Sequence, residues 1–149
     1  MKDHTKSLLY FCKIGNAEQI LSLMNYTDID FNAFDENGMT ALHYTVLHRF
    51  QTIVTEILKK ENVDLNLKNS EERTPLHLAA IHPNQEITHA LLSMSNININ
   101  TKDKQQNSLL ETAIEHNNIY MVDTLSKRTD LDLSTLTGRR NPLYIAAKS

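Results

Sequence analysis

Glycine and proline are scarce in this chain of 149 residues, which contains only three of each. Because tight turns depend on these residues, their scarcity argues against a β-sandwich, a barrel or a glycine-rich nucleotide-binding fold, and it favours helices. The single cysteine, Cys12, excludes an intrachain disulfide and a zinc site built from several thiolates. A one-cysteine chain is typical of a reducing compartment, so we expect the protein in the cytoplasm.

Long apolar runs and a strong net charge are also missing. No run approaches the ~20 apolar residues that a membrane helix needs, and the first residues lack a signal-peptide pattern. The formal net charge of −3 gives no bulk attraction to nucleic acid or to an anionic membrane. The 40% of hydrophobic residues suffices for one folded domain, which we expect to span residues 1–149.

The sequence repeats itself with a period close to 34 residues. Three sets of equivalent residues recur at this spacing, and we call each set a column. The first column contains leucines, the second contains apolar residues, and the third contains N-cap formers two positions before the leucines. The columns are Leu8, Leu42, Leu76, Leu110 and Leu143; Phe31, Leu65, Ile99 and Leu133; and Thr40, Thr74, Ser108 and Asn141. This periodicity predicts a repeat protein rather than an ordinary globular domain.

Each repeat has the pattern of two helices followed by an extended turn. Pro75 and Pro142 stand at the first position of a helix, where a missing N–H costs nothing. Helically spaced residues such as Ile53 and Ile57 mark the second helix. The alternating stretch at residues 62–66 predicts a short projecting finger rather than a strand. Because a unit of this size cannot bury its own apolar faces, we expect the units to stack.

The segment Thr74-Pro75-Leu76-His77-Leu78-Ala79-Ala80 resembles the TPLHLAA signature of ankyrin repeats. Thr40-Ala41-Leu42-His43-Tyr44-Thr45 is a close second, and residues 32–38 resemble the finger loop of that family. The resemblance implies an all-α ankyrin-repeat solenoid of stacked helical hairpins with projecting β-turn fingers. We expect four repeats at residues 5–37, 38–71, 72–105 and 106–139, plus a partial fifth at 140–149.

Two features depart from the family pattern. In the second finger Asn69 and Glu72 replace the usual aspartate and glycine, and in the third finger Gln106 replaces the glycine. We therefore expect these two fingers to be distorted or looser than the first. The chain also stops inside the first helix of its fifth repeat, which predicts either a longer natural protein continuing beyond residue 149 or an unusual C-terminal cap.

Chemically active groups are few. Cys12 falls at the small-residue position that Ala80 fills elsewhere, so we interpret it as a packing residue rather than a nucleophile. The resemblance implies that His43 and His77 tie the start of a helix to the adjacent loop. Motifs for phosphate binding, acyl hydrolysis and zinc proteolysis are missing from the sequence. We therefore predict that the protein is not an enzyme and uses no cofactor and no metal.

Three more histidines, His48, His82 and His116, recur every 34 residues and predict a column along the stack. Packed helices lie ~8–10 Å apart, whereas zinc needs all its ligands at ~2 Å, so the column does not fit a shared metal ion. Two interpretations stay open: a solvated ladder, or a partner contact that makes binding depend on pH.

The resemblance also implies a function. In ankyrin arrays the finger tips and the exposed side of the first helices form a concave groove that binds proteins or peptides. We therefore expect a non-catalytic protein–protein interaction module that is monomeric and binds neither nucleic acid nor membrane. The matching positions are Phe34, Glu36, Asn37, Met39, Tyr44, Leu47 and His48 in the first full unit; Lys68, Ser70, Glu71, Arg73, Ile81 and His82 in the second; and Lys102, Lys104, Gln105, Asn107, Glu115 and His116 in the third.

The apolar members of the first set predict an energetic centre in the N-terminal half of the groove. The alternative is that they only pack against neighbouring fingers. Two other functions stay open: a substrate-recognition or autoinhibitory domain of a longer multidomain enzyme, or a secreted bacterial or viral effector acting in the host cytoplasm.

Asn66 is a candidate modification site. In many ankyrin repeats the finger asparagine is β-hydroxylated by an asparaginyl hydroxylase, and Asn66 has the preferred surroundings, with Leu58 eight residues before it and Asp64-Leu65 immediately before it. The alternative role is that of a hydrogen-bonding turn asparagine.

Overall fold

The computed structural model describes residues 3–135. This part of the chain holds eight α-helices in four consecutive pairs, a short 3-10 helix at Leu133–Thr135 and no β-strand. The pairs are α1 (Asp3–Ile14) with α2 (Ala17–Leu23), α3 (Ala41–Leu47) with α4 (Gln51–Leu58), α5 (Pro75–Ile81) with α6 (Gln85–Leu92), and α7 (Leu109–Glu115) with α8 (Ile119–Ser126). The prediction of an all-α array of helical hairpins is confirmed.

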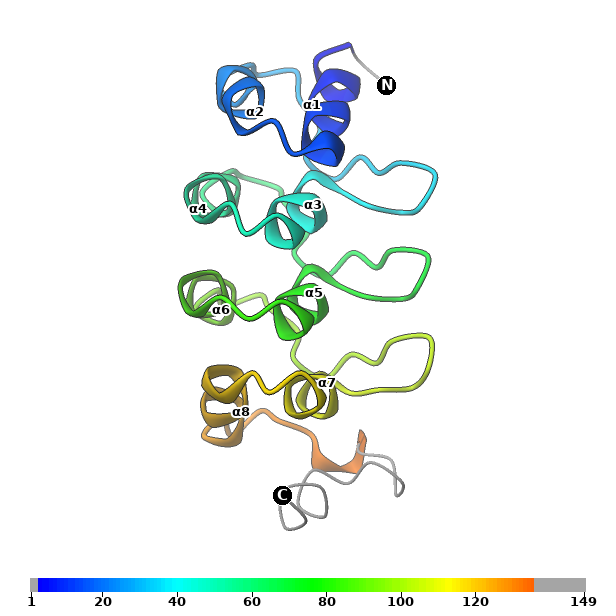
Figure 1. Cartoon of the computed structure of the whole chain (residues 1–149), viewed down its shortest axis with the longest axis vertical. Coiled ribbons are helices and arrows are strands. Elements are labelled where there is room, and N and C mark those ends of the chain that lie inside the picture. The colour runs from blue at the N-terminus through cyan, green and yellow to red at the C-terminus, as the bar shows by residue number, and fades with distance from the viewer. Residues whose placement is uncertain (1–2, 136–149) are drawn as a thin grey trace.

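The pairs stack on one another in chain order (Figure 1). The first helices of the pairs form one column, the second helices form another, and three fingers project on the same side of the stack (Figure 1). Each first helix packs on the first helix of the next pair, from α1 through α3 and α5 to α7. The predicted partial repeat at 140–149, with its cap Asn141, lies outside the described residues.

The core follows the leucine column of the sequence. All four of its described members are buried: Leu8, Leu42, Leu76 and Leu110. Cys12 belongs to the same core, and burial raises the pKa of its thiol to about 12. The interpretation of Cys12 as a packing residue rather than a nucleophile is therefore supported, because a reactive cysteine needs an accessible thiolate.

The predicted N-caps start the first helices. Thr40, Thr74 and Ser108 each accept a hydrogen bond from the backbone N–H three residues later. The third residue of each of these helices returns a bond to the cap backbone, which completes a capping box. In α7 this residue is Glu111 instead of histidine, and its carboxylate accepts from the Ser108 N–H at 3.3 Å. Loss of the signature histidine therefore leaves the cap intact.

His43 also links neighbouring repeats, as the resemblance implies. Its Nδ1 accepts from the Thr40 N–H at 3.2 Å, so the proton is assigned to Nε2. Nε2 lies 3.0 Å from the carbonyl oxygen of Arg73, at the base of the next finger. One imidazole thus holds the start of its own helix and the following finger together.

All three fingers have the same turn geometry, so the prediction of distorted second and third fingers is wrong. Gly38, Glu72 and Gln106 have left-handed φ angles of 72°, 56° and 67°. Each donates its N–H to the carbonyl three residues earlier, at 2.8 to 3.0 Å. Placing an L-residue in this region costs about 1–2 kcal/mol, a strain that the surrounding turn imposes on Glu72 and Gln106.

The replaced aspartate of the second finger has an equivalent role. The Asn69 side-chain oxygen accepts from the N–H groups of Glu71 and Arg73, both at 3.0 Å. Asp35 accepts from the corresponding N–H groups of the first finger, at 2.9 and 3.0 Å. Asparagine replaces aspartate here because the turn needs an oxygen acceptor and not a charge.

The fingers are also joined to one another. The Asn37 carbonyl accepts from the Ser70 N–H at 2.9 Å, and the Glu71 carbonyl accepts from the Lys104 N–H at 2.9 Å. These backbone bonds run from the first finger through the second to the third. The finger row is therefore one hydrogen-bonded unit, and its outer surface is held in a fixed shape.

Candidate protein-binding surface

The predicted groove residues of the first full repeat are divided by burial. Phe34, Glu36 and Asn37 are exposed, and Leu47 and His48 are half-buried. Met39 and Tyr44, in contrast, keep only 9% and 6% of their surface. Two of the four predicted apolar contact residues therefore pack inside the molecule, which is the alternative that the sequence left open.

Tyr44 is buried because it closes the first finger. Its hydroxyl donates a hydrogen bond to the Asp35 carboxylate. Burial opposes ionisation of Asp35, but the bonds from Tyr44 and from the backbone amides of Met39 and Asn37 outweigh it and lower the pKa of the carboxyl. Burial, and then the bond to Asp35, raises the pKa of the Tyr44 phenol. The pair fixes the finger to α3 rather than presenting a contact surface.

The predicted groove residues of the next two repeats are mainly polar and accessible. The exposed ones are Lys68, Ser70, Glu71, Lys104, Gln105, Glu115 and His116, and the half-buried ones are Arg73, Ile81, His82, Lys102 and Asn107. Some of these side chains already have internal partners. Lys68 Nζ donates to the carbonyl oxygen of Lys102 at 3.3 Å, and Arg73 Nε lies 3.6 Å from the buried Asp103 carboxylate.

The sequence did not predict that two apolar residues of α1 belong to the exposed surface. Tyr10 is 59% exposed and Ile14 is 53% exposed. They lie on the same helix face as Lys13, whose ammonium binds the Glu36 carboxylate of the first finger at 2.6 Å. This face therefore looks towards the first finger, where Phe34 is 61% exposed. We call Tyr10, Ile14 and Phe34 the N-terminal apolar patch.

A signal for Tyr10 and Ile14 was present in the sequence. They stand 34 residues before Tyr44 and His48, two positions that the sequence assigned to the groove. The resemblance assigns groove residues to units that follow a finger, and the described residues contain no finger before α1, so Tyr10 and Ile14 were not predicted.

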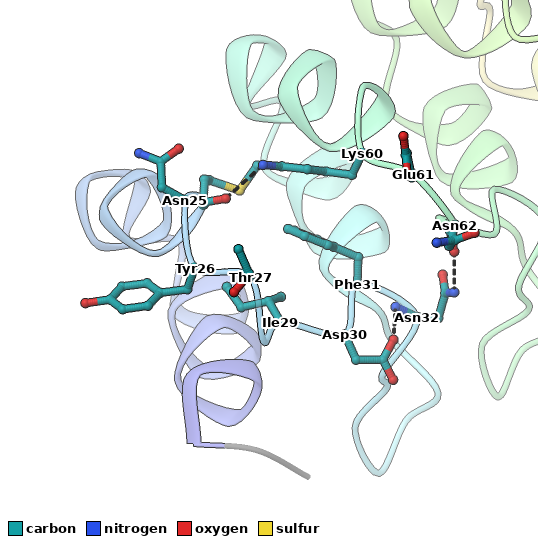
Figure 2. Close-up of a pocket in the computed structure, with 11 residues that line it drawn as sticks. Asn25, Tyr26, Thr27, Ile29, Asp30, Phe31, Asn32, Lys60, Glu61 and Asn62 are labelled. Carbon is teal, nitrogen blue, oxygen red and sulfur yellow. Dashed lines mark hydrogen bonds between the residues drawn. The ribbon is translucent and has the colours of Figure 1, made fainter.

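A cleft of about 410 Å³ opens between the first two repeats, and none of the three patch residues lines it (Figure 2). Ile29 and Phe31 are apolar lining residues, and Lys60 extends across the cleft, whereas the Tyr26 ring points away from Phe31 and Lys60 (Figure 2). The Lys60 ammonium donates to the carbonyl oxygen of Met24 at 2.9 Å and lies 5.8 Å from the centre of the Phe31 ring. The cation of this cleft thus ties two repeats together.

Substitution of Lys60 provides a test of this tie. We expect Lys60→Met to lower the free energy of unfolding by about 1 kcal/mol, through loss of one charged hydrogen bond and one cation–π contact. Methionine occurs naturally at the equivalent Met94. Lys60→Arg is the matched control, because Arg128 makes the same bond to the Leu92 carbonyl at 2.9 Å. Urea unfolding compares the variants; equal stability of the two would contradict the assignment.

The finger asparagines form a second set of ties. Asn66 Nδ2 donates to the Asn96 carbonyl at 2.9 Å, and its Oδ1 accepts from the Asn98 N–H at 2.9 Å. Asn32 and Asn100 make the same two bonds to their following repeats. A turn asparagine with a structural role is therefore supported. Hydroxylation of Asn66 stays a prediction, and an enzyme would first have to open this bridge.

Within residues 3–135, the structure brings together no group of three metal-binding side chains. The same residues contain no helix that is long and apolar enough to cross a membrane.

The stack of helical hairpins with hydrogen-bonded fingers defines a repeat solenoid. A family model described as ankyrin repeats (three copies) matches residues 51–135. The chain belongs to the ankyrin-repeat family, whose members are generally protein–protein interaction modules and typically non-catalytic. The helices α1 to α3 precede the matched region. No curated protein matches the sequence.

Proposed function

We propose that this protein is a non-catalytic binding module that holds a protein or peptide partner at the N-terminal apolar patch and along the adjoining groove. One observation carries the proposal. Three of the seven large apolar side chains exposed in the described residues, Tyr10, Ile14 and Phe34, come from α1 and the first finger, which the ion pair of Lys13 with Glu36 holds together. Apolar side chains gathered at one end of a surface are typical of an interaction site.

The fold does not require this exposure. Tyr10 and Tyr44 occupy the same repeat position, yet Tyr44 is 6% exposed and Tyr10 is 59% exposed. Tyr44 is covered because its hydroxyl binds the finger that precedes its own helix, whereas the described residues contain no finger before α1. Aromatic side chains of this kind contribute strongly to binding when a partner covers them. We therefore expect the partner to contact Tyr10 on the exposed face of α1.

The polar residues of the second and third repeats extend this surface. We propose that Lys68, Ser70, Glu71, Lys104 and Gln105, at the exposed finger tips, contribute to specificity more than to affinity. Charged groups at the rim of an interface mainly orient the partner. We further propose a monomer acting in the cytoplasm.

Affinity capture from a cytosolic lysate tests the proposal. The chain would be compared with the variant Tyr10→Ser/Ile14→Ser/Phe34→Ser, and captured proteins identified by mass spectrometry. The matched control is Leu21→Ser/Ile119→Ser, which removes exposed apolar surface from second helices. We expect at least one partner to be lost with the patch variant and kept with the control.

Circular dichroism and urea unfolding would first show that all three proteins are equally folded. If every captured partner survives in the patch variant, the patch is not the binding site. If the control loses the same partners, binding depends on the second helices instead.

A further inference from the structure

The Lys60 ammonium in the cleft between the first two repeats has no carboxylate partner. Lys60 is half-buried, and its ammonium forms no ion pair among the residues that the structure describes. One of its three N–H groups donates to the Met24 carbonyl at 2.9 Å. The two lining carboxylates, those of Asp30 and Glu61, are exposed and lie apart from the ammonium (Figure 2). The other N–H groups of this cation are therefore left for another acceptor.

The fourth repeat shows what the second one lacks. Arg128 occupies the position of Lys60 and likewise donates to a carbonyl of the preceding repeat, that of Leu92, at 2.9 Å. Its guanidinium also holds the Asp130 carboxylate through two hydrogen bonds of 2.9 and 2.8 Å. In the second repeat Asn62 takes the position of Asp130, and its side chain carries no charge. The second repeat thus keeps the cation but lacks the carboxylate.

Phe31 adds an aromatic surface beside this cation. Phe31 is half-buried, and the centre of its ring lies 5.8 Å from the Lys60 ammonium. In the next two repeats the equivalent side chains, Leu65 and Ile99, are only 1% and 2% exposed. Ile29 also lines the cleft, whose volume of about 410 Å³ falls within the ~300–1,000 Å³ range of ligand pockets. The cleft therefore combines a cation, apolar lining and room for a small molecule.

We propose that this cleft binds a small organic acid whose carboxylate lies a few bonds from an aromatic ring. The carboxylate accepts hydrogen bonds from Lys60 and supplies the negative charge that Asp130 supplies to Arg128. The aromatic ring of the ligand packs against Phe31 and Ile29. This site is separate from the N-terminal apolar patch, so the inference does not rest on the proposed function.

Both parts of the ligand contribute to its affinity. A hydrogen bond between an ammonium and a carboxylate is about twice as strong as a neutral one, and partial burial reduces the screening of Lys60 by salt. An anion without an apolar part leaves Phe31 in contact with water. The Asp30 carboxylate does not compete for the cation, because it accepts from the Asn32 N–H at 2.9 Å within its own turn. We therefore expect selectivity for molecules that carry both groups.

Titration of the full chain with 3-phenylpropionate, followed by NMR of the backbone amides, tests this inference. The comparison molecules are 3-phenylpropionamide, which has the ring but no charge, and acetate, which has the charge but no ring. We expect a dissociation constant on the order of 1 mM for 3-phenylpropionate and binding about tenfold weaker for both comparison molecules. The signals that shift should belong to the lining segments, residues 24–32 and 60–62.

Two protein variants complete the test. Lys60→Met removes the cation and is expected to weaken binding of 3-phenylpropionate about tenfold. Lys59→Met is the matched control, because Lys59 is the exposed neighbour of Lys60 and pairs with Glu56 at 2.9 Å. It is expected to bind like the unchanged protein. Circular dichroism checks that each variant is folded, and the comparison of the acid with its amide tests the cation in the unchanged chain.

A six-residue peptide that ends in phenylalanine with a free carboxylate distinguishes a small acid from the end of a protein chain. We expect the peptide to bind more weakly than 3-phenylpropionate, because it loses more conformational freedom. Tighter binding of the peptide would overturn the inference in favour of a protein C-terminus. The inference also fails if the amide binds as tightly as the acid, if the lining signals do not shift, or if Lys60→Met keeps the full affinity.

Discussion

Replacing Gly38 with alanine is expected to lower the free energy of unfolding by about 3 kcal/mol. Gly38 has a φ of 72°, where an L-residue costs about 1–2 kcal/mol. A Cβ at this position would also lie 2.9 Å from Asn69 Cα and 3.1 Å from Ser70 N. Both atoms belong to the backbone of the next finger, so they cannot rotate away, and the overpacking adds a similar cost.

The displacement would also disturb the bond from the Ser70 N–H to the Asn37 carbonyl, which joins the two fingers. Urea unfolding monitored by circular dichroism measures the effect. We expect some loss of binding as well, because the finger row would no longer hold its shape.

Gly15→Ala is the matched control for this substitution. Gly15 has nearly the same φ, 74°, but its added Cβ would meet only the side chain of His48, at 3.2 Å. We expect a loss of about 1 kcal/mol, close to the conformational cost alone. Equal losses for the two glycines would show that contact between fingers contributes nothing beyond backbone strain.

Lowering the pH from 7 to 5 is expected to remove about 2 kcal/mol of stability through His77 alone. Burial lowers the pKa of His77 to about 4, whereas an unfolded histidine titrates near 6.5. The unfolded chain therefore binds the proton more readily than the folded one. The stability is fully present above pH 6.5 and is lost as the pH falls towards 4. Burial also lowers the pKa of His43, which acts in the same direction.

Urea unfolding at pH 7 and pH 5 measures this dependence. His77→Gln keeps a side chain suited to a capping box but removes the titration, so its loss of stability between the two pH values should be about 2 kcal/mol smaller. His89→Gln, at an exposed position, should retain the full dependence. If His77→Gln retains it too, His77 is not the group responsible.

The local elements follow from the sequence because their causes are local. The N-caps Thr40, Thr74 and Ser108 start helices where predicted, since each cap bonds to a backbone N–H only three residues away. The leucine column is buried where predicted because its 34-residue step places one leucine at the same point of every hairpin. Repetition of these short-range patterns was enough to indicate a stack of helical hairpins, and the signature segment at residues 74–80 indicated the family.

The finger geometry was predicted poorly because it depends on neighbouring repeats. Glu72 and Gln106 lack the conformational freedom of glycine, yet they adopt left-handed φ angles. Their turns are held by the side-chain oxygens of Asn69 and Asp103, which accept bonds from backbone N–H groups of the same finger, and by the backbone bonds that join each finger to the one before it. Local propensity alone indicated looser turns, and tertiary bonding overrides it.

The binding surface was predicted only in part, for a related reason. The sequence alone determined the repeat and the capping, because these follow from spacing along the chain, whereas the place of the finger tips in a groove was implied by the resemblance to ankyrin repeats. The tertiary structure decided which groove residues reach solvent. Met39 and Tyr44 are covered because they contact fingers of the stack, whereas Tyr10 is exposed because the described residues contain no finger before α1. The exposure of a groove residue therefore depends on the finger that packs over it.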